Sequence, residues 1–283
     1  PVNNSILSDQ VLSLEFSRRF CTSEIRSGRL PLWCPNYYLG APLTKWPKYS
    51  PFHLIYYLFP TPVALAWMHL AKCLVAGVGA YLFFRRSLGV GYWPAVCGAW
   101  CFPLTGFLIL WQGYTMSFTV AWLPWLLLAV ESTVNRPGRF GGIGLALATC
   151  LTVLTGQVDV GALVLMATGI YGICCLVDRW YQTRTLPLVA RSTLALVGGW
   201  VVGLLLTAPY LLPQIEYSRT GHRFEQRGAG TEERPPTGLN ALARTVMPFV
   251  YGRNKRGNIY LSNGNRLESA AGSYAGLMSA LLL

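Results

Sequence analysis

The sequence predicts an all-α protein: a polytopic transmembrane helix bundle whose extracytoplasmic first loop contains short interfacial helices. Hydrophobic residues make up 53% of the 283 residues, and charged residues only 12%, about half the usual share of about 25%. The mean hydropathy is +0.39, and the apolar residues occur in long runs rather than in alternation. These observations exclude an ordinary soluble domain and an intrinsically disordered chain.

Residues 1–61 are predicted to form a loop that lies on the membrane. A short helix is expected near residues 8–27. The stretch 27–60 then holds six prolines, so we expect no helix to run through it. The same stretch holds seven Trp and Tyr residues, which collect at the membrane–water interface.

Six apolar spans follow, and each approaches the roughly 17–25 residues that cross a bilayer, although the third and fourth are short. The spans are at 62–84, 92–110, 116–130, 142–155, 160–177 and 188–212. We expect 62–212 to be six transmembrane helices, 213–271 a second outer loop, and 272–283 the start of a truncated helix. Because the chain starts at Pro1 and ends within an apolar run, we expect it to be an internal piece of a longer protein.

The basic residues predict the orientation. Net charge is +12, but the basic residues are scattered between spans, which argues against nucleic-acid binding. The loops after the first, third and fifth spans hold seven arginines, whereas the short loops 111–115 and 156–159 hold no basic residue. The positive-inside rule therefore places residues 1–61 and 213–271 on the extracytoplasmic face of a plasma membrane.

Few acidic residues are available for chemistry on that outer face. They are Asp9, Glu15, Glu24, Asp159, Glu216 and Glu268. Asp9 fits a helix N-cap as well as a catalytic role. Asp159 fits a solvated turn, but an acid at the mouth of a bundle is also a candidate for function.

Two clusters of charged residues allow both a structural and a functional interpretation. Glu216, Arg219 and Arg223 share a helix face, with His222 beside them, which fits an intrahelical ion pair or a phosphate clamp. His69 and Lys72 lie on one face of the first span, where a structural pair is slightly favoured over a functional site.

Other motifs are missing or weak. The sequence has no Walker loop, nucleophile elbow, dinucleotide fingerprint or zinc helix, so we expect no nucleotide cofactor. Of the eight cysteines, Cys21 and Cys34 lie outside the predicted spans and could pair in an oxidising compartment.

Several stretches follow one another in an order that resembles a known family. They are Ser-Gly-Arg-Leu-Pro-Leu-Trp-Cys-Pro at 27–35, Leu-Gly-Ala-Pro-Leu at 39–43, Tyr-Ser-Pro at 49–51, Ala-Pro-Tyr-Leu-Leu-Pro-Gln-Ile-Glu-Tyr-Ser-Arg at 208–219, and Glu268 with Tyr-Ala-Gly-Leu at 274–277. This pattern resembles the YfhO-like bacterial membrane proteins of the GT-C superfamily of glycosyltransferases, over nearly the whole chain.

The resemblance implies a GT-C-like fold, a further span before Pro1, and transfer of a sugar from a polyprenyl-phosphate-linked donor to a cell-envelope polymer or lipid. Asp9 matches the first-loop acid that serves as base or as ligand for Mg²⁺ or Mn²⁺, with Glu15 and Glu24 as alternatives. The donor phosphate would be held by Arg219, Arg223 or the divalent cation. The family often has a His where this chain has Gln157, which leaves Asp159 as the nearby ionisable group.

Two other function classes also fit. A transporter or lipid flippase would use Lys72 and His69 within a span and proline-broken helices. A non-catalytic envelope-assembly subunit would keep the fold without the chemistry. Both would share the membrane lipids as partners and would need no nucleic acid.

Overall fold

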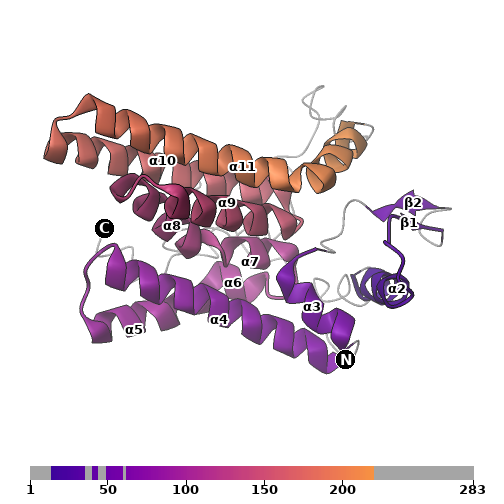
Figure 1. Ribbon diagram of the computed structural model, residues 1–283. Coiled ribbons are helices and arrows are strands. Elements are labelled where there is room, and N and C mark those ends of the chain that lie inside the picture. The colour runs from indigo at the N-terminus through magenta and orange to yellow at the C-terminus, as the bar shows by residue number, and fades with distance from the viewer. Residues whose placement is uncertain (1–13, 36–39, 44–48, 60–61, 220–283) are drawn as a thin grey trace, which may run out of the picture.

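The computed structural model describes residues 14–35, 40–43, 49–59 and 62–219, and it is mainly helical (Figure 1). An outer segment contains α2 (Glu15–Arg26), the strands β1 (Trp33–Cys34) and β2 (Ala41–Pro42), and α3 (Pro51–Leu58). The bundle contains α4 (Pro62–Arg86), α5 (Tyr92–Cys101), η3 (Phe102–Leu104), α6 (Gly106–Leu110), α7 (Thr115–Val120), α8 (Leu123–Asn135), α9 (Arg139–Leu154), α10 (Val158–Thr183) and α11 (Leu186–Arg219).

The outer segment combines two short helices with a small hairpin. α2 matches the helix predicted near 8–27 over its described part, and β1 and β2 pair antiparallel, with Trp33 opposite Pro42. No helix runs through the whole stretch 27–60, and its short helix α3 spans Pro51–Leu58. Pro51 occupies the first turn of this helix, where a missing N–H breaks no hydrogen bond.

Within the described residues, four helical segments are long and apolar enough to cross a membrane, which supports the predicted all-α membrane bundle. They are Val63–Arg86, Thr115–Asn135, Val158–Thr183 and Leu186–Tyr217. The fourth predicted span is the shorter apolar helix α9. The prediction of one continuous span at 92–110 is wrong, because the chain there forms α5, η3 and α6. Pro103 has no N–H to continue an α-helix, and the 3₁₀ turn surrounds it.

The bundle exposes long apolar faces. Along α10, the side chains of Leu163, Met166, Ile170 and Ile173 are all more than half exposed. Soluble proteins rarely present so continuous an apolar surface to water. These faces therefore fit the hydrocarbon of a bilayer.

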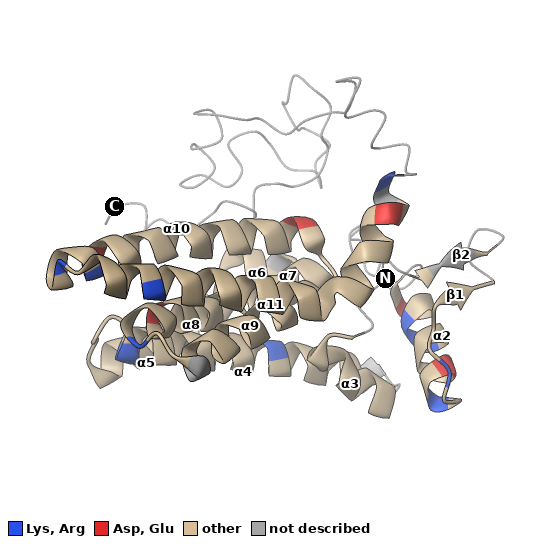
Figure 2. Cartoon of the chain, turned by 45° about the horizontal axis from the view of Figure 1, so that its top comes forward, with Lys and Arg blue, Asp and Glu red and all other residues tan. Residues whose placement is uncertain are grey.

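Charged residues gather at the ends of the spans, which are nearly free of them along their middle (Figure 2). The α4–α5, α8–α9 and α10–α11 connections lie at one end of the bundle (Figure 1). The arginines that predicted the orientation lie in these connections or in the helix ends beside them. Arg136 and Arg184 are in the connections, and the helix ends carry Arg85, Arg86, Arg139, Arg179 and Arg191.

Among the described helices, α9 and α11 make the most extensive contact and pack side by side. A Cβ atom at Gly203 would lie 2.6 Å from Thr149 Cβ and 2.7 Å from the Ala146 carbonyl oxygen. A Cβ atom at Gly199 would lie 2.9 Å from Leu145 Cδ2. Gly199 and Gly203 form a GxxxG motif, and in membranes such small residues let two helix backbones approach closely.

Candidate functional site

Specific polar contacts join α2 to α3 within the outer segment, and α3 packs on the bundle. Arg26 at the end of α2 donates from Nε to the Tyr57 carbonyl oxygen at 3.1 Å and from Nη2 to that of Leu58 at 2.7 Å. These carbonyls close α3, whose last turn leaves them without helical partners. α3 in turn packs on α4. This arrangement brings residues of α2 and α3 over the outer halves of α4 and α7.

The Phe118 ring on α7 is the centre of the contact. Phe52 stacks on it with ring centroids 5.2 Å apart. The His69 ring lies parallel to it at 5.9 Å, and the His53 ring meets it edge-on at 5.8 Å. Lys72 Nζ lies 6.0 Å from the centroid. Side chains from α3 and α4 therefore converge on one aromatic ring.

Lys72 is buried to 1% exposure, ten residues into α4 and so about 15 Å from its outer end. Its Nζ donates to the Leu108 carbonyl oxygen at 3.1 Å and to Ser117 Oγ at 3.4 Å. Leu108 lies near the C-terminus of α6, where carbonyl groups favour a cation. No carboxylate within the described part of the chain lies within ion-pair distance of Lys72.

Arg18 brings a second buried cation from α2. It is 8% exposed, and its Nη2 donates to the Gly113 carbonyl oxygen at 3.2 Å. Burial lowers the pKa of the guanidinium, and the charge of Glu15 opposes that effect. Gly113 lies in the short connection between α6 and α7, and Leu108 lies in α6 itself. The two cations therefore bind carbonyl groups in neighbouring parts of the chain.

Two histidines complete what we call the basic cluster: Arg18, His53, His69 and Lys72. His53 is 4% exposed, and burial, followed by the charge of Arg18, lowers its pKa to about 3. The imidazole is therefore neutral at pH 7. Within the described part of the chain, the Nδ1 atoms of His53 and His69 are buried without a hydrogen-bond partner.

Glu15 is a carboxylate beside this cluster, and its charge acts on Arg18. Its Oε1 accepts hydrogen bonds from Tyr56 OH at 2.8 Å and from Arg19 Nε at 2.9 Å. Its Oε2 is buried and has no hydrogen-bond partner among the residues that the structure describes. Burial first, and then the hydrogen bond and charge of Glu15, raise the pKa of Tyr56 to about 12. Glu15 was one of the alternatives to Asp9, and it lies one turn from Arg18 on α2.

The predicted site residues lie partly outside and partly inside the described residues. Asp9, His222 and Arg223 lie outside the described residues. Asp159 is exposed in the first turn of α10, while Glu216 and Arg219 are exposed near the end of α11.

Glu24 has a structural partner. Its two carboxylate oxygens accept from Arg29 Nε and Nη2, both at 2.8 Å, and this hydrogen bonding is the main reason that its pKa is lowered. Gln157, the position where the family often has a His, accepts a hydrogen bond from Thr115 Oγ1 at 2.8 Å. Cys21 and Cys34 are buried in one cluster with Leu43 and Tyr57, and no disulfide joins the two cysteines.

Arg18 is the residue that sequence reasoning missed. A signal was present, because the buried positions of α2 are Ser17, Arg18, Cys21 and Thr22. These positions form the inward face of an amphipathic helix by their spacing of three and four. An arginine on that face requires a buried partner, which Gly113 provides.

A metal centre is not seen in the described ranges, where no group of three or more His, Cys, Asp or Glu side chains could hold an ion; Asp9, the predicted ligand, lies outside them. Comparison with protein-family models, with curated proteins and with solved structures finds no match to this chain.

Proposed function

We propose that the protein is a membrane glycosyltransferase that moves a sugar from a polyprenyl-phosphate-linked donor to an acceptor in the bacterial cell envelope, on the extracytoplasmic side of the plasma membrane. The observation that carries the proposal is the buried Lys72, a cation with two neutral hydrogen-bond acceptors. Desolvating a charge is unfavourable unless an opposite charge or dipoles compensate for it. A donor phosphate would supply the opposite charge.

Three further features support the proposal. Arg18, His53 and His69 surround the same region, so that a phosphate could receive several hydrogen bonds and two positive charges. Apolar helix faces beside it suit a polyprenyl tail. The sequence resemblance to YfhO-like proteins implies the same donor class.

In this proposal Asp9 orients or deprotonates the acceptor hydroxyl group. The basic cluster stabilises the charge that develops on the departing phosphate. Arg219 and Arg223 remain second candidates for holding that phosphate.

The competing proposal is a transporter or lipid flippase. It is favoured by the same Lys72, because an ionisable residue in a span often marks a transport path. The proline-broken helix that would suit transport is not seen in α11, which continues through Pro209 and Pro213. An envelope-assembly subunit without catalysis is the third candidate.

A turnover assay separates these candidates. The full-length protein in lipid nanodiscs would be incubated with radiolabelled polyprenyl-phosphate-linked sugars and an envelope fraction as acceptor. We expect label in the acceptor with wild type, and none with Asp9→Asn at equal expression. Normal sugar transfer by Asp9→Asn would show that Asp9 is not the catalytic residue.

The transport alternative predicts a different result. In proteoliposomes the labelled donor would cross the bilayer chemically unchanged, and no sugar would reach the acceptor. An assembly subunit would give neither transfer nor movement.

A further inference from the structure

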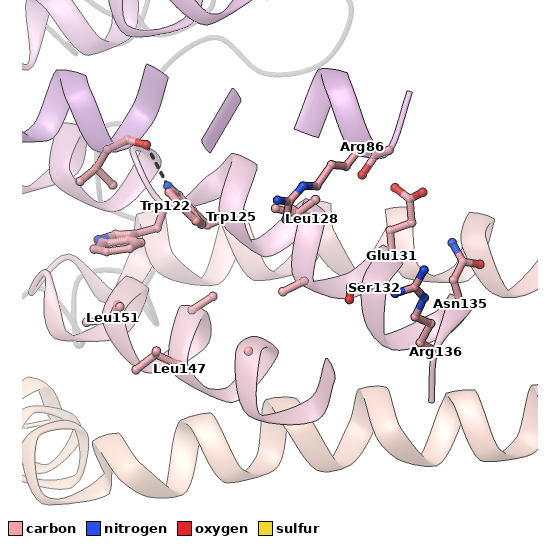
Figure 3. A pocket seen from close by; sticks show the side chains of 15 residues that line it. Arg86, Trp122, Trp125, Leu128, Glu131, Ser132, Asn135, Arg136, Leu147 and Leu151 are labelled. Atoms are coloured by element: carbon pink, nitrogen blue, oxygen red, sulfur yellow. Dashed lines mark hydrogen bonds between the residues drawn. The ribbon is translucent and has the colours of Figure 1, made fainter. Parts of the chain in front are cut away.

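A cavity of about 960 Å³ opens between α4, α8 and α9, at the upper end of the range of about 300–1,000 Å³ for ligand pockets. It has two chemically different ends (Figure 3). Arg86, Glu131 and Arg136 lie at one end, and Trp122, Trp125 and Leu147 lie toward the other. We call it the inner cavity, because its polar end belongs to the face that the positive-inside rule assigns to the cytoplasm.

The polar end carries a surplus of positive charge. Arg86 and Arg136 are exposed and have no ion-pair partner within the described residues. Glu131 does not pair with them, and its Oε2 accepts a hydrogen bond from Tyr171 OH at 3.0 Å. Figure 3 shows Arg86 extending from this end toward Leu128, so its guanidinium is presented to the cavity.

The other end is an apolar pocket with a fixed wall. Trp125 Nε1 donates to the Val75 carbonyl oxygen at 2.8 Å, which holds that ring in place (Figure 3). Trp122 is 9% exposed and packs on Phe52 with ring centroids 5.8 Å apart. Because Phe52 also stacks on Phe118, these rings separate the inner cavity from the basic cluster.

The cavity is open along α9. Leu147 is 55% exposed, and Gly144 on the same helix is exposed as well. A Cβ atom at Gly144 would meet no other atom within 4 Å. The two residues lie three positions apart and so on one helix face. A ligand could therefore enter sideways from the bilayer.

We propose that the inner cavity binds an anionic phospholipid of the cytoplasmic leaflet, with the phosphate headgroup at Arg86 and Arg136 and an acyl chain beside Trp122, Trp125 and Leu147. Arginine guanidinium groups match phosphate oxygens. The apolar end of the cavity matches a lipid tail rather than free phosphate. This site is distinct from the proposed donor site and does not depend on the proposed function.

Native mass spectrometry of the full-length protein tests the proposal. The protein in detergent is titrated with phosphatidylglycerol and, separately, with phosphatidylcholine of the same acyl chains. We expect phosphatidylglycerol to bind at least tenfold more tightly. Arg86→Gln and Arg136→Gln should each weaken it about fivefold, as expected for one arginine near an anionic headgroup. Arg191→Gln, which removes an exposed arginine of α11 that does not line the cavity, should leave binding within twofold.

A second pair of variants tests the apolar slot without changing charge. Gly144→Phe fills the open space in the cavity, and we expect it to reduce phosphatidylglycerol binding at least tenfold. The matched control is Gly169→Phe on α10, where an added Cβ also meets no atom within 4 Å and the residue does not line the cavity. Equal melting temperatures of the two variants would show that both fold.

Four results would overturn the proposal: equal affinity for the two phospholipids, unchanged binding in both arginine variants, unchanged binding in Gly144→Phe, or no lipid binding by wild type. The first would indicate general lipid adhesion. Complete absence of lipid binding by wild type would indicate that a protein segment fills the cavity. Polyprenyl phosphate binding should be the same in all these variants, so a failure here leaves the proposed function intact.

Discussion

The ammonium group of Lys72 donates a hydrogen bond to the carbonyl oxygen of Leu108 at 3.1 Å, which ties the middle of α4 to the end of the short helix α6. This contact satisfies Lys72 with a dipole instead of an opposite charge. The net charge of the region therefore stays positive, and this decides what Lys72 variants should do.

Lys72→Met should preserve the fold and weaken binding of polyprenyl phosphate. A buried charge without an opposite charge is costly to desolvate. Methionine of similar size removes that cost, so we expect an equal or higher melting temperature. Removal of one charge-assisted hydrogen bond should reduce affinity about 10- to 100-fold. Binding would be measured by native mass spectrometry in the same detergent.

Ser117→Ala is the matched control. It removes the weaker Lys72 contact at 3.4 Å but keeps the charge, so affinity should stay within twofold. A large loss of stability in Lys72→Met with unchanged affinity would instead assign Lys72 a purely structural role.

The stability of the outer segment should depend on His53 at acidic pH. Its pKa is about 3 in the folded protein, against an ordinary value of 6.5, so below pH 6.5 the unfolded chain binds a proton that the folded chain does not. Stability therefore falls as the pH decreases from 6.5 toward 3. Between pH 6.5 and 4.5 this amounts to about 2–3 kcal/mol.

Thermal unfolding of wild type and His53→Gln in detergent at these two pH values measures the effect. Glutamine cannot take up a proton, so His53→Gln should lose less stability on acidification than wild type. Parallel losses in the two proteins would show that His53 is not the group responsible.

Arg26 should hold α2 against α3. Arg26→Met removes the hydrogen bonds to Tyr57 and Leu58, and we expect a local loss of about 1–3 kcal/mol. The amides of α2 should then exchange hydrogen faster in mass-spectrometric exchange experiments, while those of α10 are unchanged. Arg19→Met, which breaks only an exposed ion pair with Glu15, should have little effect because solvent screens such pairs.

The sequence predicts the bundle well because hydrophobic runs and loop charges are local signals. The long helices, α2 and the gathering of arginines at one end all follow from such signals. The break at Pro103 was also readable in principle, but proline is tolerated in membrane helices often enough that composition alone favoured a continuous span. Here α5 stops before it.

The basic cluster could not be assembled from the sequence. Arg18 and His53 are separated from Lys72 by 54 and 19 positions (72 − 18 and 72 − 53), and they meet only because α2 and α3 fold over α4. His69 and Lys72 were visible as a pair, but their neighbours were not. Asp159, Glu216 and Arg219 are candidates because charged residues are few on the predicted outer face. Their small number does not reveal which of them lie close together in the folded protein.

The α9–α11 contact gives the sharpest test of the packing. Gly203→Ala should destabilise the bundle by about 1–3 kcal/mol, the usual penalty of overpacking, because the new Cβ would lie 2.6 Å from Thr149 Cβ and 2.7 Å from the rigid Ala146 carbonyl oxygen. The control is Gly198→Ala on the same helix, where a Cβ would meet no atom within 4 Å. Both variants make the same chemical change, so intrinsic helix preference cancels in the comparison. Thermal unfolding in detergent should show a lower melting temperature for Gly203→Ala only, and equal temperatures for the two variants would contradict the close approach of α9 and α11.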